Sequence, residues 1–145
     1  MSAETWHPTR YRVLYADTDA GRVVYYGAYL RFFELGRTEL MRDLVMPNSE
    51  VERELGIILP VVECHCRYKA PAMYDDLLEI ETRIVSVKPV SCGFDYRIRR
   101  VGDGRLLVKG STIHAPVNRE GRLVRFPEKL VERLGAGLSH QENPS

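Results

Sequence analysis

The chain has 145 residues, a formal net charge of +1 and the apolar and charged fractions of an ordinary globular protein. This length suits one domain with its own core, and the near-neutral charge gives no electrostatic reason to bind nucleic acid or an acidic membrane surface. No apolar run approaches the roughly 18 residues of a membrane span, and the N-terminus lacks the features of a secretion signal. Three cysteines without framework spacing favour a reducing compartment. We therefore expect a cytoplasmic protein with no integral membrane segment.

The first expected elements are a short strand and a long helix. Residues 1–9 are polar and contain proline, so we expect a loosely ordered arm, and the alternation from Tyr11 to Tyr15 predicts the first strand. Apolar residues at helical spacing then predict a helix over residues 28–45, with a stripe that Leu30 and Met41 widen: Tyr29, Phe33, Gly36, Leu40 and Leu44. Gly36 costs about 1 kcal/mol of helix propensity relative to alanine, which predicts a close backbone approach there.

The rest of the chain predicts one short helix, four strands and a final helix. Residues 48–56 form a capped helix pattern closed by glycine. Alternation predicts strands at 62–70, 78–84 and 94–99, and a Gly-Asp-Gly turn leads into a fourth at 106–117. Residues 127–134 predict a short helix, and we expect 136–145 to be loosely ordered. One helical stripe and several amphipathic strands favour an α+β fold, in which an antiparallel sheet of about five strands packs around one long helix.

Two carboxylates, Asp17 and Asp19, lie where the first predicted strand gives way to the long helix. Amide groups at a helix start have no partner within the helix, and together with the helix dipole they suit a developing anion. A carboxylate beside such a site can serve acyl transfer. An EF-hand calcium loop is excluded because its fifth and twelfth positions would be Gly21 and Ala28, and an Asp-x-Asp phosphatase also fails at Gly21. An acidic turn that only caps backbone amides is an equal alternative to catalysis.

No metal site and no cofactor motif is predicted. On a strand, Cys64 and Cys66 face away from His65, so the three cannot bind one ion, and we expect buried cysteines and an exposed histidine. His114 near the end of an apolar strand is interpreted as a core histidine. The arginines between residues 97 and 100 are interpreted as a solvated strand face, and Lys88 as an ordinary loop cation rather than a phosphate contact.

The stretch YADTDAGRVVYYGAY, residues 15–29, followed by FELGRTE at 33–39, closely resembles the signature of the 4-hydroxybenzoyl-CoA thioesterase family. It is most similar to the branch that includes the Tol–Pal-associated acyl-CoA thioesterases. The segments YKAP at 68–71 and YDDLLEIET at 74–82 extend the resemblance. The resemblance implies a single hotdog domain over residues 1–145. It also implies a homodimer or homotetramer, with acyl-CoA bound between two subunits.

The resemblance also implies roles for single residues. Asp19 corresponds to the catalytic carboxylate, acting as nucleophile or general base, and the backbone N–H of Tyr26 to the group that polarises the thioester carbonyl. Asp17 then has a structural role in the turn. Many relatives have glycine where this chain has Arg22, and histidine where it has Tyr26. The substrate-binding candidates are Val24, Tyr25, Gly27 and, as the alternative to the loop interpretation given above, Lys88.

The implied function is hydrolysis of an acyl-CoA to free acid and CoA, without a cofactor. The alternative is a non-catalytic protein that binds acyl-CoA or an acyl carrier, or a scaffold, since a fold alone does not establish catalysis. A hotdog dehydratase is disfavoured because its His-plus-Glu pattern is not visible. Tyr25, Tyr29 and Phe33 are candidates for an acyl pocket, but a core stripe is the simpler interpretation.

Overall fold

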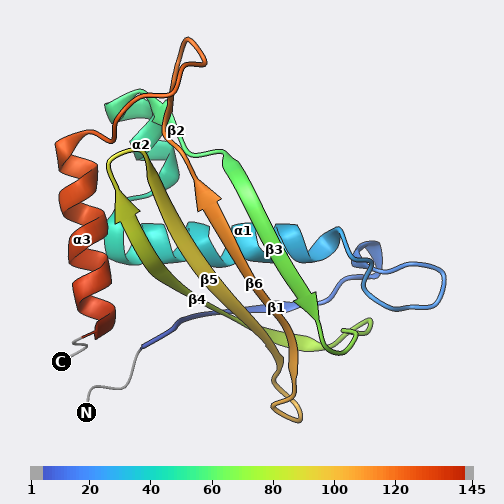
Figure 1. The fold of residues 1–145 in the computed structure, drawn as a ribbon. Coiled ribbons are helices and arrows are strands. Elements are labelled where there is room, and N and C mark those ends of the chain that lie inside the picture. The colour runs from blue at the N-terminus through green and yellow to red at the C-terminus, as the bar shows by residue number, and fades with distance from the viewer. Residues whose placement is uncertain (1–4, 143–145) are drawn as a thin grey trace.

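The computed structural model of the protein describes residues 5–142, in which one curved sheet lies across a long helix (Figure 1). The five strands are all antiparallel and follow the order β1-β4-β5-β6-β3. They comprise β1 (His7–Arg12), β3 (Val61–Tyr68), β4 (Leu77–Lys88), β5 (Ser91–Arg100) and β6 (Leu106–His114). The helices are α1 (Ala28–Leu40), α2 (Asn48–Leu55) and α3 (Glu128–Glu142), with a 3-10 turn at Tyr15–Asp17 and a π-helical turn at Met41–Val45. Strands β2 (Ile57–Ile58) and β7 (Val117–Asn118) form a separate pair.

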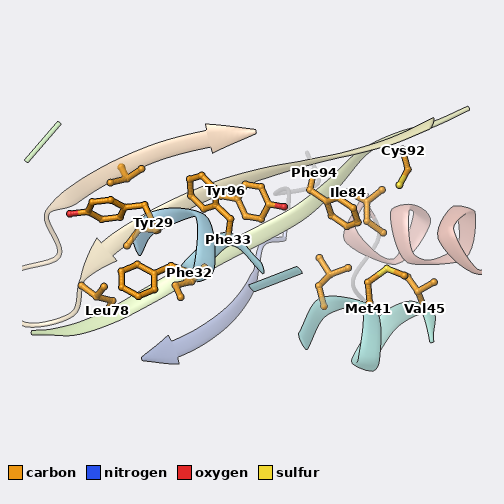
Figure 2. Packing of buried hydrophobic residues seen from close by; sticks show 14 of the residues in the cluster. Tyr29, Phe32, Phe33, Met41, Val45, Leu78, Ile84, Cys92, Phe94 and Tyr96 are labelled. Atoms are coloured by element: carbon orange, nitrogen blue, oxygen red, sulfur yellow. The ribbon is translucent and has the colours of Figure 1, made fainter. Parts of the chain in front are cut away.

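Helix α1 and its π-helical extension confirm the helix predicted over residues 28–45. Its buried side chains pack under the sheet, where the rings of Phe33 and Tyr96 stack at 4.3 Å between centroids (Figure 2). The predicted stripe needs one correction: Phe32 is buried, whereas Leu30 is 49% exposed. The sheet covers the side of α1 that carries residues 29, 32, 33, 36 and 40, and Leu30 lies outside it.

Gly36 lies where α1 meets β4 most closely. A Cβ added at this position would overlap Thr82 Oγ1 and lie 2.7 Å from Ile80 Cγ2. Both side chains are fully buried, so neither has free space to move into. The close approach predicted from Gly36 is therefore confirmed.

The predictions for the two ends of the chain were partly wrong. Strand β1 begins at His7 and ends at Arg12, because residues 7–12 pair with β4 and residues 15–17 turn away from it. Helix α3 continues to Glu142, well into the segment expected to be loosely ordered. The Gln141 side chain accepts a hydrogen bond from the Ile84 N–H (2.8 Å) and donates one to the Ile84 carbonyl (2.9 Å). Ile84 lies beyond Thr82, where the pairing of β4 with β1 stops, so Gln141 takes the place of a strand partner there. Residues 1–4 and 143–145 lie outside the described chain.

Strand β3 is an edge strand, and this changes the interpretation of its cysteines. Seven of its eight residues are exposed, including Cys64, whereas Cys66 is partly buried. The prediction that both cysteines are buried was therefore wrong, because an alternating pattern does not reveal whether anything covers the strand. None of the described residues forms a group of His, Cys, Asp or Glu side chains suited to a metal ion. No helix of the described chain is long and apolar enough to cross a membrane.

Candidate active site

The segment between β1 and α1 is a compact turn that ends in Val24. The Asp19 amide donates to the Val23 carbonyl (2.9 Å) and the Arg22 amide to the Asp19 carbonyl (3.0 Å). Arg22 has φ 64°, in the left-handed region that favours glycine. A glycine would adopt this conformation without the steric cost that a Cβ brings. The guanidinium of Arg22 lies 5.0 Å from the centre of the Tyr74 ring.

Asp17 supports this turn through hydrogen bonds and is not among the residues that line the cavity beside Asp19. Its carboxylate is 1% exposed and accepts three hydrogen bonds: from the Tyr11 hydroxyl (2.6 Å), the Leu14 amide (2.8 Å) and Arg31 Nη2 (2.5 Å). Burial by itself raises the pKa of Asp17, but these hydrogen bonds outweigh burial and lower the pKa below its ordinary value. A carboxylate whose oxygens are satisfied in this way is suited to holding the turn rather than to reacting.

Asp19 has the opposite environment. Its side chain is exposed and accepts one hydrogen bond, from the Gly21 amide to Oδ1 (2.8 Å). It borders a cavity of about 400 Å³ at the junction of the turn, the start of α1 and the end of β3. The other lining residues are Val23, Val24, Tyr25, Tyr26, Tyr29, Tyr68, Lys69, Ala70 and Pro71. The structure thus places Asp17 and Asp19 in different environments, one buried and hydrogen-bonded and the other exposed at a cavity.

The start of α1, whose residues Tyr25, Tyr26 and Tyr29 border this cavity, carries amide groups without an acceptor in the described chain. The Ala28 amide donates to the Tyr25 carbonyl (3.0 Å) and the Tyr29 amide to the Tyr26 carbonyl (3.2 Å). The amides of the two preceding residues, Tyr26 and Gly27, donate to no acceptor within residues 5–142. Unpaired amides at a helix start, together with the helix dipole, favour a partial negative charge nearby.

Tyrosine rings form one wall of the cavity. The rings of Tyr26 and Tyr68 lie 4.5 Å apart, and those of Tyr29 and Tyr68 lie 5.4 Å apart. The Tyr68 hydroxyl donates to the Tyr26 carbonyl (3.3 Å), and burial raises the pKa of Tyr68, so it stays protonated as a donor. The contribution of Tyr68 was missed from the sequence, although its position in the segment YKAP was a usable signal. Tyr29 belongs both to the core and to this wall.

The predicted site residues are only partly brought together by one chain. Asp19, Val24, Tyr25 and Tyr26 line the same cavity, and Gly27 follows directly at the helix start. Lys88 lies at the opposite end of β4 from Leu77, the residue that pairs with the end of β1. That separation is about 36 Å along the strand. A single subunit therefore does not place Lys88 at the cavity.

His114 is a satisfied core residue, as predicted. It is 1% exposed, and its Nδ1 and Nε2 atoms lie 2.9 Å from the Leu59 carbonyl and 2.8 Å from Thr112 Oγ1. Because a carbonyl only accepts, Nδ1 carries the hydrogen and Nε2 accepts from Thr112, which in turn accepts from Tyr96 (2.6 Å). Burial lowers the pKa of His114 to about 4, so the ring is neutral at pH 7.

Comparison with known proteins identifies the family and the fold. A family model described as the thioesterase-like superfamily matches residues 13–134. The acyl-CoA thioesterase YbgC of Haemophilus influenzae is 35% identical over 121 residues, covering 82% of this chain and 87% of that protein. A putative esterase of Aquifex aeolicus is 30% identical over 125 residues, covering 86% of this chain and 94% of that protein. The crystal structure of a probable thioesterase from Bartonella henselae is similar at a TM-score of 0.79 and 32% identity, covering 85% of this chain and all of that one. This chain therefore belongs to the thioesterase-like superfamily and has the hotdog fold.

Proposed function

We propose that the protein hydrolyses the thioester of an acyl-CoA to the free acid and CoA. The observation that carries this proposal is the exposed Asp19 carboxylate in the same cavity as the helix start, where the amides of Tyr26 and Gly27 have no acceptor within the described chain. The activity named for the Haemophilus influenzae relative supports the substrate class. A protein that only binds acyl-CoA has no need of an exposed carboxylate beside the carbonyl.

In this mechanism the thioester oxygen accepts a hydrogen bond from the Tyr26 amide, which stabilises the negative charge that develops on it. Oδ1 of Asp19 is held by the Gly21 amide, so Oδ2 is the oxygen free to act. As a nucleophile, Oδ2 attacks the carbonyl carbon and the C–S bond breaks, leaving a mixed anhydride that water then hydrolyses. As a general base, Oδ2 takes a proton from the water that attacks the carbonyl. Both routes use the same two groups.

We also propose that two subunits complete the site through β3. This strand leaves one edge of the sheet unpaired within the described chain, with Val61 and Val62 exposed on it, and pairing with a second copy covers such an edge. Lys88 lies at the same end of the sheet as Val61, because β4, β5, β6 and β3 pair antiparallel in succession. Antiparallel pairing of two β3 strands reverses one sheet relative to the other. The partner subunit's Lys88 then lies at the end of β3 that carries Tyr68 and the cavity.

A homodimer or homotetramer of this kind is the expected working form. The three free cysteines favour a reducing, cytoplasmic environment. Neither substrate binding nor the proposed reaction requires a metal or cofactor, since the carboxylate and the backbone amide supply the chemistry.

The decisive experiment is Asp19→Asn in the full-length chain, assayed for CoA thiol release with short-chain, long-chain and aromatic acyl-CoAs. We expect turnover to fall by at least about 10³ while acyl-CoA binding is retained, because the amide oxygen keeps the shape of the carboxylate but neither attacks nor takes a proton. Asp75→Asn is the matched control, since Asp75 is also exposed and does not line the cavity. Full activity of Asp19→Asn would exclude Asp19 from the mechanism. Binding without hydrolysis by the wild type across the panel would favour the non-catalytic alternative.

The amide is tested separately at Tyr26. Tyr26→Pro removes the N–H, whereas Tyr26→His keeps it and changes only the side chain. We expect the proline variant to lose about 10²–10³ in kcat and the histidine variant to stay close to the wild type. Equal losses in both variants would show that the side chain, not the amide, matters. Circular dichroism establishes that both variants fold.

A further inference from the structure

The regular part of β3, residues 63–68, lies on a free edge of the sheet within the described chain. Its side chains alternate between the face that packs on α1 and the outer face of the sheet. The ring of Tyr68 lies 5.4 Å from that of Tyr29 on α1, whereas Arg67 lines a cavity of about 640 Å³ on the opposite face. The inner row is Cys64, Cys66 and Tyr68, and the outer row is Glu63, His65 and Arg67. The ionisable acidic and basic groups of this edge therefore all lie in the outer row.

Two opposite charges of the outer row are incompletely compensated within one subunit. Arg67 forms no ion pair with any described residue, and it faces Lys109 on β6, which in turn faces Arg97 on β5. Like charges directly opposite each other on neighbouring strands destabilise a sheet. The carboxylate of Glu63 lies 3.7 Å from His65 Nε2 and forms no other ion pair within residues 5–142. A carboxylate brought against Arg67 from beyond the free edge would therefore stabilise this row.

The backbone of this edge is free to pair with a further strand. The Lys69 amide donates to the Leu107 carbonyl (2.8 Å), in the register that β3 keeps with β6. Backbone groups of alternate residues point to the same side of a strand, so those of residues 63, 65 and 67 also point to β6. The N–H and C=O groups of the inner row then point to the free edge. A second copy of β3, running antiparallel, would pair with all of them.

Two-fold symmetry restricts how two copies of β3 can pair. Opposed residues of an antiparallel pair point to the same face of the sheet, so an inner residue must oppose an inner one. The two-fold axis therefore passes through a residue that faces its own copy, and residues equally far from it on either side oppose each other. In the middle of the strand this residue is Cys64, His65 or Cys66. Moving the axis by one residue shifts the partner by two residues, about 7 Å.

The three registers differ in what they place opposite Arg67. An axis at His65 sets it against the partner subunit's Glu63, and symmetry forms the same ion pair a second time. An axis one residue earlier sets Arg67 against the partner subunit's Val61. An axis one residue later sets it against the partner subunit's His65 and gives Glu63 only Lys69, which lies beyond the end of β3. Of the three, the register centred on His65 alone supplies Arg67 with a carboxylate.

We propose that two copies of β3 pair about an axis at His65 and are held in this register by reciprocal Glu63–Arg67 ion pairs. This inference rests on the proposed function, because it specifies how the two subunits of the proposed site meet. Opposite charges directly across an antiparallel pair stabilise it, and like charges disfavour the other alignments. In this register the start of the partner's β3 lies beside Tyr68, at the edge of the cavity that Asp19 borders. The ion pairs thus determine which part of the partner closes that cavity.

The first test co-expresses two variants of the full chain, Glu63→Arg and Arg67→Glu. Each homodimer sets like charges against each other at both places, whereas the heterodimer sets opposite charges there. We expect the ratio of heterodimer to homodimers, counted by native mass spectrometry, to exceed the random ratio about tenfold. Glu120→Arg with Arg122→Glu is the matched control pair, because both positions are exposed and lie outside β3, and it should assort at random. Random assortment of the edge variants, or a monomeric wild type, would overturn the proposal.

The two cysteines of the inner row report the register independently. An axis at His65 sets Cys64 opposite the partner subunit's Cys66, with Cβ atoms about 4.5–5.5 Å apart, which suits the short thiol cross-linker dibromobimane. Cys64→Ser and Cys66→Ser should each lose the cross-linked dimer on a denaturing gel, and co-expression of the two should restore it. A cross-linked dimer of Cys66→Ser alone would place the axis at Cys64, and one of Cys64→Ser alone would place it at Cys66. Either result would contradict the proposed register.

Both experiments measure association and need no substrate. If the wild type hydrolyses no acyl-CoA, the proposed function fails, and the heterodimer ratio and the cross-links still decide the register. If the edge variants assort at random while the wild type hydrolyses acyl-CoA, the register fails and the proposed function stands.

Discussion

Replacing Gly36 with alanine should raise the helix propensity of α1 but disrupt the packing of α1 against β4. In an isolated helix the change would stabilise by about 1 kcal/mol. In this protein the new methyl group would overlap Thr82 Oγ1 and lie 2.7 Å from Ile80 Cγ2, both on a fully buried strand. Overpacking of this kind costs about 3 kcal/mol at its usual upper end, so we expect a net loss of about 2 kcal/mol. For a chain of this size that lowers the melting temperature by about 4–8 °C.

Two glycines of α3 provide matched controls for the same substitution. A Cβ at Gly135 would meet nothing within 4 Å, so Gly135→Ala should stabilise by the helix propensity alone, about 1 kcal/mol. A Cβ at Gly137 would lie 3.1 Å from Ile84 Cδ1, so the gain in stability from Gly137→Ala should be smaller or absent. Urea and thermal denaturation of the three variants measure their order of stability. A Gly36→Ala variant as stable as the wild type, or a Gly135→Ala variant that loses as much, would refute the reasoning.

Three further predictions concern stability. Gln141→Ala should cost about 2 kcal/mol in urea denaturation, because the buried N–H and C=O of Ile84 both lose their partner, and Gln141→Glu should not restore it because it lacks the donor. The pKa of His114 is about 4 in the folded protein and about 6.5 in the unfolded chain. Its contribution to the free energy of unfolding is therefore complete above pH 6.5 and is lost as the pH falls towards 4, by about 3 kcal/mol in total. His114→Gln should remove that part of the pH dependence, and an unchanged slope would contradict the assignment. Arg22→Gly should be more stable than Arg22→Ala by about 1 kcal/mol, because φ is 64° and both variants lose the contact with Tyr74.

Local patterns in the sequence were enough for α1, for four of the five main strands and for the close approach at Gly36. These features depend on short-range periodicity and on backbone conformation, which residue types report directly. The pattern was insufficient at the chain ends. The order of α3 beyond residue 135 depends on Gln141 meeting Ile84, which is 57 residues away in the chain. The exposure of Cys64 similarly depends on β3 being the outer strand of the sheet.

At the candidate site, the spacing of the two aspartates from the helix was visible in the sequence, and the resemblance pointed to Asp19. The tertiary structure separated the two acids, because it buries Asp17 under hydrogen bonds from Tyr11 and Arg31 and leaves Asp19 in a cavity. It also brings Tyr68 from β3 to the helix start, and it places Lys88 at the end of β4 far from the cavity of the same subunit. Residue order specifies which elements form, since that is a matter of local energies. Which side chains share a cavity is decided only when strands distant in sequence pair in one register.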